Sequence, residues 1–147
     1  MSTVTLRNDV RCIYDAALRA VDPAKAIRRH VERNENILNI DGIPYNLDHY
    51  ERCFVVGAGK AGAVMASTME SLLGDRLTGG AINVKYGHTM PLQKVDVIEA
   101  AHPIPDMAGV KGTEKIVKIL ENVGEHDLVF CLLSGGGLRL CLYHLRV

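Results

Sequence analysis

Two glycine-rich turns stand out among the residues whose types and spacing could do chemistry. The first, Gly57-Ala58-Gly59-Lys60-Ala61-Gly62, follows an apolar run and opens a predicted helix, so it matches GxGxxG in its usual strand–turn–helix context. Glycines let the backbone approach an anion, and free N–H groups of a first helical turn point toward it. Lys60 in that turn is unfavourable unless an anion lies nearby. We therefore predict a phosphate or carboxylate site at Gly57, Gly59 and Lys60; the alternative is a packing turn with Lys60 in solvent.

The second turn, Ser134-Gly135-Gly136-Gly137, closes the apolar run 128–133. Three consecutive glycines cost backbone entropy when they are ordered, so we interpret Ser134, Gly135, Gly136 and Gly137 as a nest of N–H groups for another anion. A flexible linker is the alternative. A nucleophilic role for Ser134 is not expected, because no GxSxG pattern surrounds it.

Polar side chains also follow two further apolar runs. Lys85 ends the run 81–85 and His88 follows it, and His102 and Asp106 come after the run 95–101. Ligands of open parallel sheets bind at the carboxyl ends of the strands, so we expect these four residues to lie near the same edge as Lys60 and Ser134. Each also has a structural explanation: backbone hydrogen bonds for the histidines, a helix N-cap for Asp106 and a surface charge for Lys85. The histidine spacing does not favour a metal site.

The elements that must position these residues alternate along the chain. The runs 53–56, 81–85, 95–101 and 128–133 predict strands, and the stretches 60–73 and about 108–123 predict amphipathic helices. Apolar strands interleaved with such helices indicate an α/β fold, in which a parallel sheet is covered by helices on both faces.

The N-terminal third has a different pattern. Apolar residues at helical spacing from Leu6 to Val21, followed by Asp22-Pro23 and a second helix to about Arg33, predict a helical hairpin. Residues 37–40 and 43–47 flank an Asp41-Gly42 turn, which predicts a β-ribbon on the surface, with Pro44 at its edge.

Composition excludes several classes of protein. The 147 residues contain 17 basic and 17 acidic side chains, so neither nucleic acid nor a membrane surface is an expected partner. Four cysteines without a CxxC pair, no secretory leader and no apolar window of membrane-spanning length predict a cytoplasmic protein.

Taken together, four motifs resemble a known family. The segments 53–62, 84–88, 101–106 and 133–137 occur in the order and spacing found in the N-terminal domain of the class II glycerate kinases, some of which are named hydroxypyruvate reductases. The resemblance implies a Rossmann-like domain that phosphorylates D-glycerate, most often at the 2-hydroxyl, with ATP and Mg²⁺. It also implies a cleft against a separate C-terminal domain. The lysine of the first loop is catalytic in that family and falls on Lys60, and the Ser134–Gly137 turn lines the substrate cleft.

Two other functions stay open at this point. One is an NAD(P)-dependent hydroxypyruvate reductase; Lys85 in place of an acid disfavours NAD but could accept the 2′-phosphate of NADP. The other is a binding remnant without catalysis.

The C-terminal residues depart from the family pattern after Gly137. We therefore expect residues 1–137 to form an incomplete N-terminal domain and residues 138–147 to be an atypical tail from a truncation or frameshift, without the C-terminal domain. Such a chain should be inactive alone, because half a cleft cannot align two substrates. The leucines of the tail would need burial of the kind that the missing C-terminal domain supplies; they are Leu138, Leu140, Leu142 and Leu145.

Overall fold

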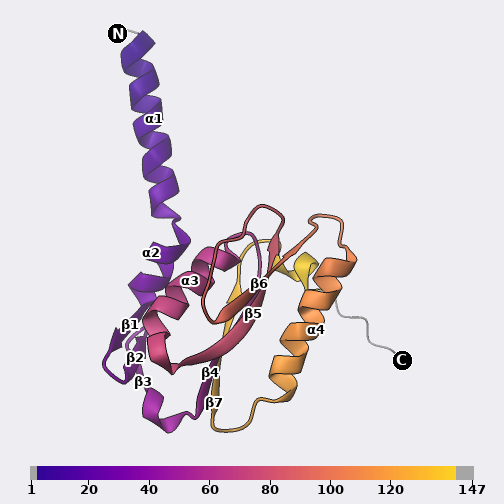
Figure 1. Ribbon diagram of the computed structural model, residues 1–147. Helices are drawn as coiled ribbons and strands as arrows, with labels where there is room; N and C mark the ends of the chain where they lie inside the picture. Colours follow the sequence, from indigo (N-terminus) through magenta and orange to yellow (C-terminus); the bar gives the residue numbers. More distant parts are fainter. Residues whose placement is uncertain (1–2, 142–147) are drawn as a thin grey trace.

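The computed structural model describes residues 3–141, which fold into two sheets and four α-helices (Figure 1). The central sheet has four parallel strands, β4 (Arg52–Ala58), β5 (Leu77–Lys85), β6 (Val95–Ala100) and β7 (Asp127–Leu133). All four correspond to predicted strands. The α/β fold class is therefore confirmed.

The order of the strands in this sheet is β6-β5-β4-β7. The chain moves outward from β4 to β5 and β6, and then returns to the other side of β4 as β7. The strand order thus reverses between β4 and β7. In open α/β sheets the crevice for ligands lies at the carboxyl ends of the strands on either side of such a reversal.

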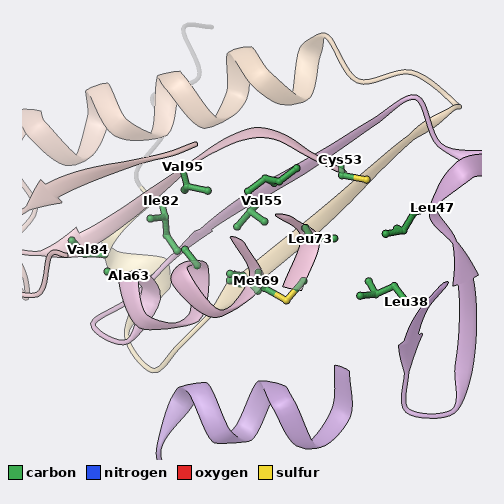
Figure 2. Packing of buried hydrophobic residues seen from close by; sticks show 13 residues of the cluster. Leu38, Leu47, Cys53, Val55, Ala63, Met69, Leu73, Ile82, Val84 and Val95 are labelled. Atoms are coloured by element: carbon green, nitrogen blue, oxygen red, sulfur yellow. The ribbon is translucent and has the colours of Figure 1, made fainter. Parts of the chain in front are cut away.

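Helices cover both faces of the central sheet, as predicted. Helix α3 (Gly62–Leu73) packs on one face and α4 (Met107–Glu121) on the other (Figure 1). Adjacent residues of β4 show the alternation, because Val55 belongs to the cluster under α3 while Val56 packs with Ile116 of α4. Figure 2 shows the first cluster, where side chains of β4, β5 and α3 meet.

Two helices precede the sheets. Helix α1 (Thr3–Ala20) projects away from the rest of the chain and is exposed, whereas α2 (Pro23–His30) packs beside α3 (Figure 1). Asp22 caps α2, since its carboxylate accepts a hydrogen bond from the Lys25 N–H. The prediction that the second helix reaches Arg33 is wrong, because it ends at His30.

The residues after His30 form a strand instead. Strand β1 (Val31–Asn34) pairs with β2 (Ile37–Ile40), and β2 pairs with β3 (Ile43–Asn46), giving a three-stranded antiparallel sheet. The turn between β2 and β3 and the edge position of Pro44 are as predicted. The expectation of a surface ribbon is only partly correct, because Leu38 and Leu47 are fully buried in the core under α3 (Figure 2).

The last described residues also pack on the domain. Residues 137–140 form a 3₁₀ turn, and Leu140 is buried between Ala58 and Ala100. This leucine is therefore buried by the domain itself, whereas we expected its burial to need the missing C-terminal domain. The side chain of Leu138, and Leu142 and Leu145, lie outside the described part. Within residues 3–141, no helix has the length and apolar character needed to cross a lipid bilayer.

Candidate functional site

The predicted site residues follow the carboxyl ends of four parallel strands and therefore lie along one edge of the sheet. Lys60 follows β4 and is exposed, whereas Lys85 ends β5 and is half-buried. His88 is exposed three residues after the end of β5, His102 is half-buried after β6, and Ser134 is half-buried directly after β7. Asp106 lies farther along the β6 loop, at the start of α4.

Close packing accounts for the glycines of the first loop. A Cβ atom on Gly57 would lie 2.0 Å from the Leu132 carbonyl oxygen in β7, and one on Gly62 would lie 2.9 Å from Ile82 Cδ1. Gly59 has φ +134°, and a Cβ there would lie 1.9 Å from Ser134 Oγ. These contacts fit the alternative in which the glycines permit strand and helix packing; an anion site at this loop remains a prediction.

The first N–H groups of the α3 turn are engaged within the protein. Ala61 N–H donates to Ser134 Oγ at 3.2 Å, and Gly62 N–H donates to the Gly59 carbonyl oxygen at 2.9 Å. Sequence reasoning expected free N–H groups here. Lys60 makes no hydrogen bond or ion pair with any residue of the range 3–141, so its ammonium group is available to a ligand.

The second glycine turn is bound to β4. Ser134 N–H donates to the Ala58 carbonyl oxygen at 3.1 Å, and Gly137 N–H donates to the Ser134 carbonyl oxygen at 2.9 Å. Gly136 has φ +81°, in the left-handed region that favours glycine. Gly135 lacks the positive φ of Gly136, and no atom lies within 4 Å of its missing Cβ, whereas a Cβ on Gly137 would lie 2.6 Å from the Ala58 carbonyl oxygen. No packing contact therefore explains a glycine at position 135.

A pocket of about 660 Å³ lies over this turn. Its walls are His102, Pro103 and residues 133–137. His102 and the glycine turn face each other closely, since a Cβ on Gly136 would lie 2.8 Å from His102 Nε2. The structure thus brings together two of the predicted groups, whereas Lys60, Lys85, His88 and Asp106 do not line this pocket.

Asp106 is the N-cap of α4, the structural explanation that the sequence offered for it. Its Oδ1 accepts a hydrogen bond from Gly109 N–H at 3.1 Å and caps α4, and its Oδ2 accepts one from the Tyr86 hydroxyl at 2.8 Å. The Tyr86 bond, with support from Gly109, lowers the pKa of Asp106, and the same bond raises the pKa of Tyr86. Tyr86, which we did not predict as a site residue, thereby anchors the loop that carries His102.

Asn83 is a second residue that sequence reasoning missed. It is fully buried in β5, and its carbonyl oxygen accepts the Gly59 N–H at 2.9 Å. Its side-chain amide donates to the Leu140 carbonyl oxygen at 2.8 Å and to Thr113 Oγ1 at 3.2 Å. Asn83 therefore connects the first glycine loop, α4 and the turn after Gly137. The signal for it was a lone polar residue inside the apolar run 81–84.

The donor set for a metal is small. No group of three His, Cys, Asp or Glu side chains within residues 3–141 could hold a metal ion. Both oxygens of Asp106 already accept hydrogen bonds. We therefore assign no Mg²⁺ ligand to the described residues.

Residues 9–144 match the protein family described as Domain of unknown function (DUF4147). The chain belongs to this family. Among DUF4147 relatives, a protein of Agrobacterium vitis provisionally named hydroxypyruvate reductase is 36% identical over 93% of this chain. A protein of Pyrococcus horikoshii named glycerate 2-kinase is 34% identical over 84% of it. The resemblance to glycerate kinases that the four motifs indicated is thereby confirmed.

Solved structures show the same fold. A crystal structure of a Pyrococcus horikoshii protein matches with a TM-score of 0.77 and 31% identity over 89% of this chain. A crystal structure of a Thermotoga maritima protein titled glycerate kinase matches with a TM-score of 0.71 and 28% identity over 92%. The DUF4147 chain spans 28% of the length of the Agrobacterium vitis relative and 27% of the Pyrococcus horikoshii relative. It spans 29% of the solved Pyrococcus horikoshii chain and 30% of the solved Thermotoga maritima chain. It therefore corresponds to less than a third of those proteins.

Proposed function

We propose that the complete protein containing this chain is a cytoplasmic glycerate 2-kinase, which transfers the γ-phosphoryl group of ATP to the 2-hydroxyl of D-glycerate. The observation that carries the proposal is the position of the two glycine turns. They follow β4 and β7, the two strands between which the sheet order reverses, in a family whose relatives include proteins named glycerate kinase.

The chemistry of this edge suits anionic substrates. Phosphoryl transfer asks a protein mainly to position two anions and to neutralise charge in the transition state. Within residues 3–141 the N–H groups of Gly135 and Gly136 have no protein acceptor, and the left-handed φ of Gly136 is typical of turns whose N–H groups converge on an anion. His102 lies beside them. We assign a carboxylate or phosphate group of the substrates to this nest.

Lys60 supplies the positive charge on the neighbouring loop. Lys60 follows β4, one of the two strands between which the sheet order reverses. Within the described range no acidic side chain forms an ion pair with it. Lys85 and His88, at the end of β5, are farther from the reversal point, and we propose for them at most a role at the rim of the site. Mg²⁺, when bound with ATP, would neutralise phosphate charge and take oxygen ligands from the phosphates.

The decisive experiment is a coupled assay of the complete protein for ADP formation with ATP and D-glycerate. We expect glycerate-dependent ADP release and a product that is 2-phosphoglycerate. The 147-residue chain assayed alone should show neither, because phosphoryl transfer needs donor and acceptor aligned in a complete cleft. Absence of ADP formation by the complete protein would refute the kinase proposal.

A hydroxypyruvate reductase is the second candidate, because a relative carries that name. The residue at the end of β5 is Lys85, whereas an NAD site has an acid at the end of its second strand to bind the ribose hydroxyls. A reductase of this family would therefore use NADP. Oxidation of NADPH by the complete protein with hydroxypyruvate would support this candidate, and failure to oxidise it would dispose of it.

A further inference from the structure

Ser134 contacts the first glycine loop through both its backbone and its side chain. Its N–H donates to the Ala58 carbonyl oxygen at 3.1 Å, and its Oγ accepts the Ala61 N–H at 3.2 Å. Both partners lie more than seventy residues earlier in the chain. The serine thus joins two loops that only the adjacent pairing of β4 and β7 brings together.

The second of these bonds provides an acceptor for one of the first N–H groups of α3. The first N–H groups of a helix have no intrahelical acceptor and are usually satisfied by a Ser, Thr, Asp or Asn side chain just before the helix. Helix α3 has Ala61 at that position, and no side chain of its own caps it. The Ser134 hydroxyl provides an acceptor from across the site.

The Ala61 N–H that Ser134 binds lies directly after Lys60 in the backbone. It belongs to the peptide unit that joins Lys60 to Ala61, so fixing this peptide fixes the backbone from which the Lys60 side chain extends. The other end of the contact is the residue directly before Gly135 and Gly136. One hydroxyl group therefore sets the position of the Lys60 backbone relative to the N–H groups of the second turn.

The space for this hydroxyl exists only because residue 59 is glycine. A Cβ atom there would lie 1.9 Å from Ser134 Oγ and 3.0 Å from its Cβ. Gly59 N–H is itself held by the Asn83 carbonyl oxygen at 2.9 Å, so the loop cannot easily move aside. The Ser134 contact therefore depends on the missing side chain of Gly59 and on the hydrogen bond between Gly59 and Asn83.

We propose that Ser134 is a positioning residue, whose hydroxyl holds the Lys60–Ala61 peptide in register with the Gly135-Gly136 turn rather than binding substrate itself. The positioning of Lys60 for an anion rests on the proposed function. The hydrogen bond itself does not, so the two can fail separately.

The bond can be tested by amide hydrogen exchange in the ¹⁵N-labelled chain. Ser134→Ala should accelerate exchange of the Ala61 N–H about fivefold or more, the scale of one net hydrogen bond. The Gly62 N–H, which donates to Gly59, should change much less. Ser134→Thr, which keeps a hydroxyl group, should restore protection. Ser71→Ala, the same substitution at an exposed position of α3, is the matched control and should change neither amide.

Titration with inorganic phosphate tests the link to Lys60. In the unmodified chain we expect phosphate to shift the Lys60 Cε–H and the Gly135 and Gly136 amide signals, and Ser134→Ala to weaken the apparent Kd about fivefold. Unchanged phosphate binding with accelerated Ala61 exchange would overturn the positioning role. No phosphate binding by the unmodified chain would count against the anion site of the proposed function, while Ala61 exchange still decides the bond.

A folding failure of Ser134→Ala does not leave the inference untested. The Ala61 N–H of the unmodified chain should itself be protected, because it has an acceptor, whereas an Ala61 N–H that exchanges at the rate of an unstructured peptide would overturn the inference directly.

Discussion

The Ser134 hydroxyl occupies the position that a side chain on Gly59 would need, at the point where the two glycine turns meet. The residues lie in loops after β4 and β7, and an ideal Cβ on Gly59 would lie 1.9 Å from Ser134 Oγ. The same serine oxygen accepts the Ala61 N–H. A side chain at position 59 and the hydroxyl of Ser134 therefore exclude each other.

We expect Gly59→Ala to destabilise the chain by about 2–3 kcal/mol. The new methyl group would displace the Ser134 hydroxyl and break its bond to Ala61, and φ +134° is unfavourable for alanine. Urea unfolding followed by circular dichroism measures the cost. In a double-mutant cycle, Ser134→Ala should relieve part of it, so the double variant should be more stable than the sum of the single changes predicts. Additive costs would show that the backbone conformation alone accounts for the effect.

Gly135→Ala should separate ligand binding from stability. Position 135 has open space and no positive φ, so alanine should change the free energy of unfolding by less than about 1 kcal/mol. If the backbone N–H groups there contact an anion, the methyl group should weaken phosphate binding, measured by titration calorimetry. Gly124→Ala, at another exposed position with ordinary contacts, serves as the control. Equal phosphate affinity in Gly135→Ala and the unmodified chain would exclude close approach of a ligand at residue 135.

Lys60→Ala in the complete protein should lower kcat for glycerate phosphorylation by about 100-fold, the scale lost with one preorganised charge contact. The unfolding midpoint should hardly change, because Lys60 is exposed and makes no hydrogen bond or ion pair with residues 3–141. Lys111→Ala, an exposed lysine of α4, should leave both quantities unchanged. Normal turnover of Lys60→Ala would place this lysine in solvent.

Asp127 should make the stability of the fold depend on acid pH. Its side chain, at the start of β7, is 3% exposed, and its carboxylate accepts hydrogen bonds from Arg52 Nε at 2.9 Å and Arg52 Nη2 at 2.6 Å. The Arg52 bonds, with Gly124 N–H, lower the pKa of Asp127 in the folded state. Its contribution is therefore complete above the unfolded pKa of about 4 and is lost as the pH falls through the lower folded value.

The measurement for Asp127 is the free energy of unfolding from pH 7 to pH 2. Asp127→Asn should be less stable than the unmodified chain at pH 7, and its stability should fall less steeply below pH 4. Asp9→Asn, in the exposed helix α1, should keep the pH dependence of the unmodified chain. An identical acid slope in Asp127→Asn would assign the acid sensitivity to other carboxylates.

Local patterns in the sequence were enough to predict the elements of the central domain. Each apolar run is a strand of the parallel sheet, and each amphipathic stretch between runs is a helix on one face. The spacing of apolar residues within a few positions is enough to indicate both. The shared edge of Lys60, Lys85, His102 and Ser134 followed from the same pattern, since parallel strands end on the same side. The Asp106 cap was also recognisable, as an aspartate just before a helical stretch.

Strand pairing and packing contacts decided the rest. Residues 31–34 are a strand because they pair with 37–40, and Arg33 Nη1 reaches the carbonyl oxygens at the end of α3, which no local helical pattern reveals. Leu38, Leu47 and Leu140 are buried because segments distant in sequence cover them. The order β6-β5-β4-β7 likewise comes from non-local pairing.

The chemistry of the candidate site divides in the same way. The residue types that suit an anion, glycines with a lysine and a histidine, were visible in the sequence. Which N–H groups remain free was not, because it depends on acceptors more than twenty residues away: Ser134 takes the Ala61 N–H and Asn83 takes that of Gly59, while those of Gly135 and Gly136 are left without a protein acceptor in the described structure. The sequence predicted an anion site at both turns; the tertiary structure engages the Ala61 and Gly62 N–H groups at the first turn and leaves those of Gly135 and Gly136 without a protein acceptor in the described residues.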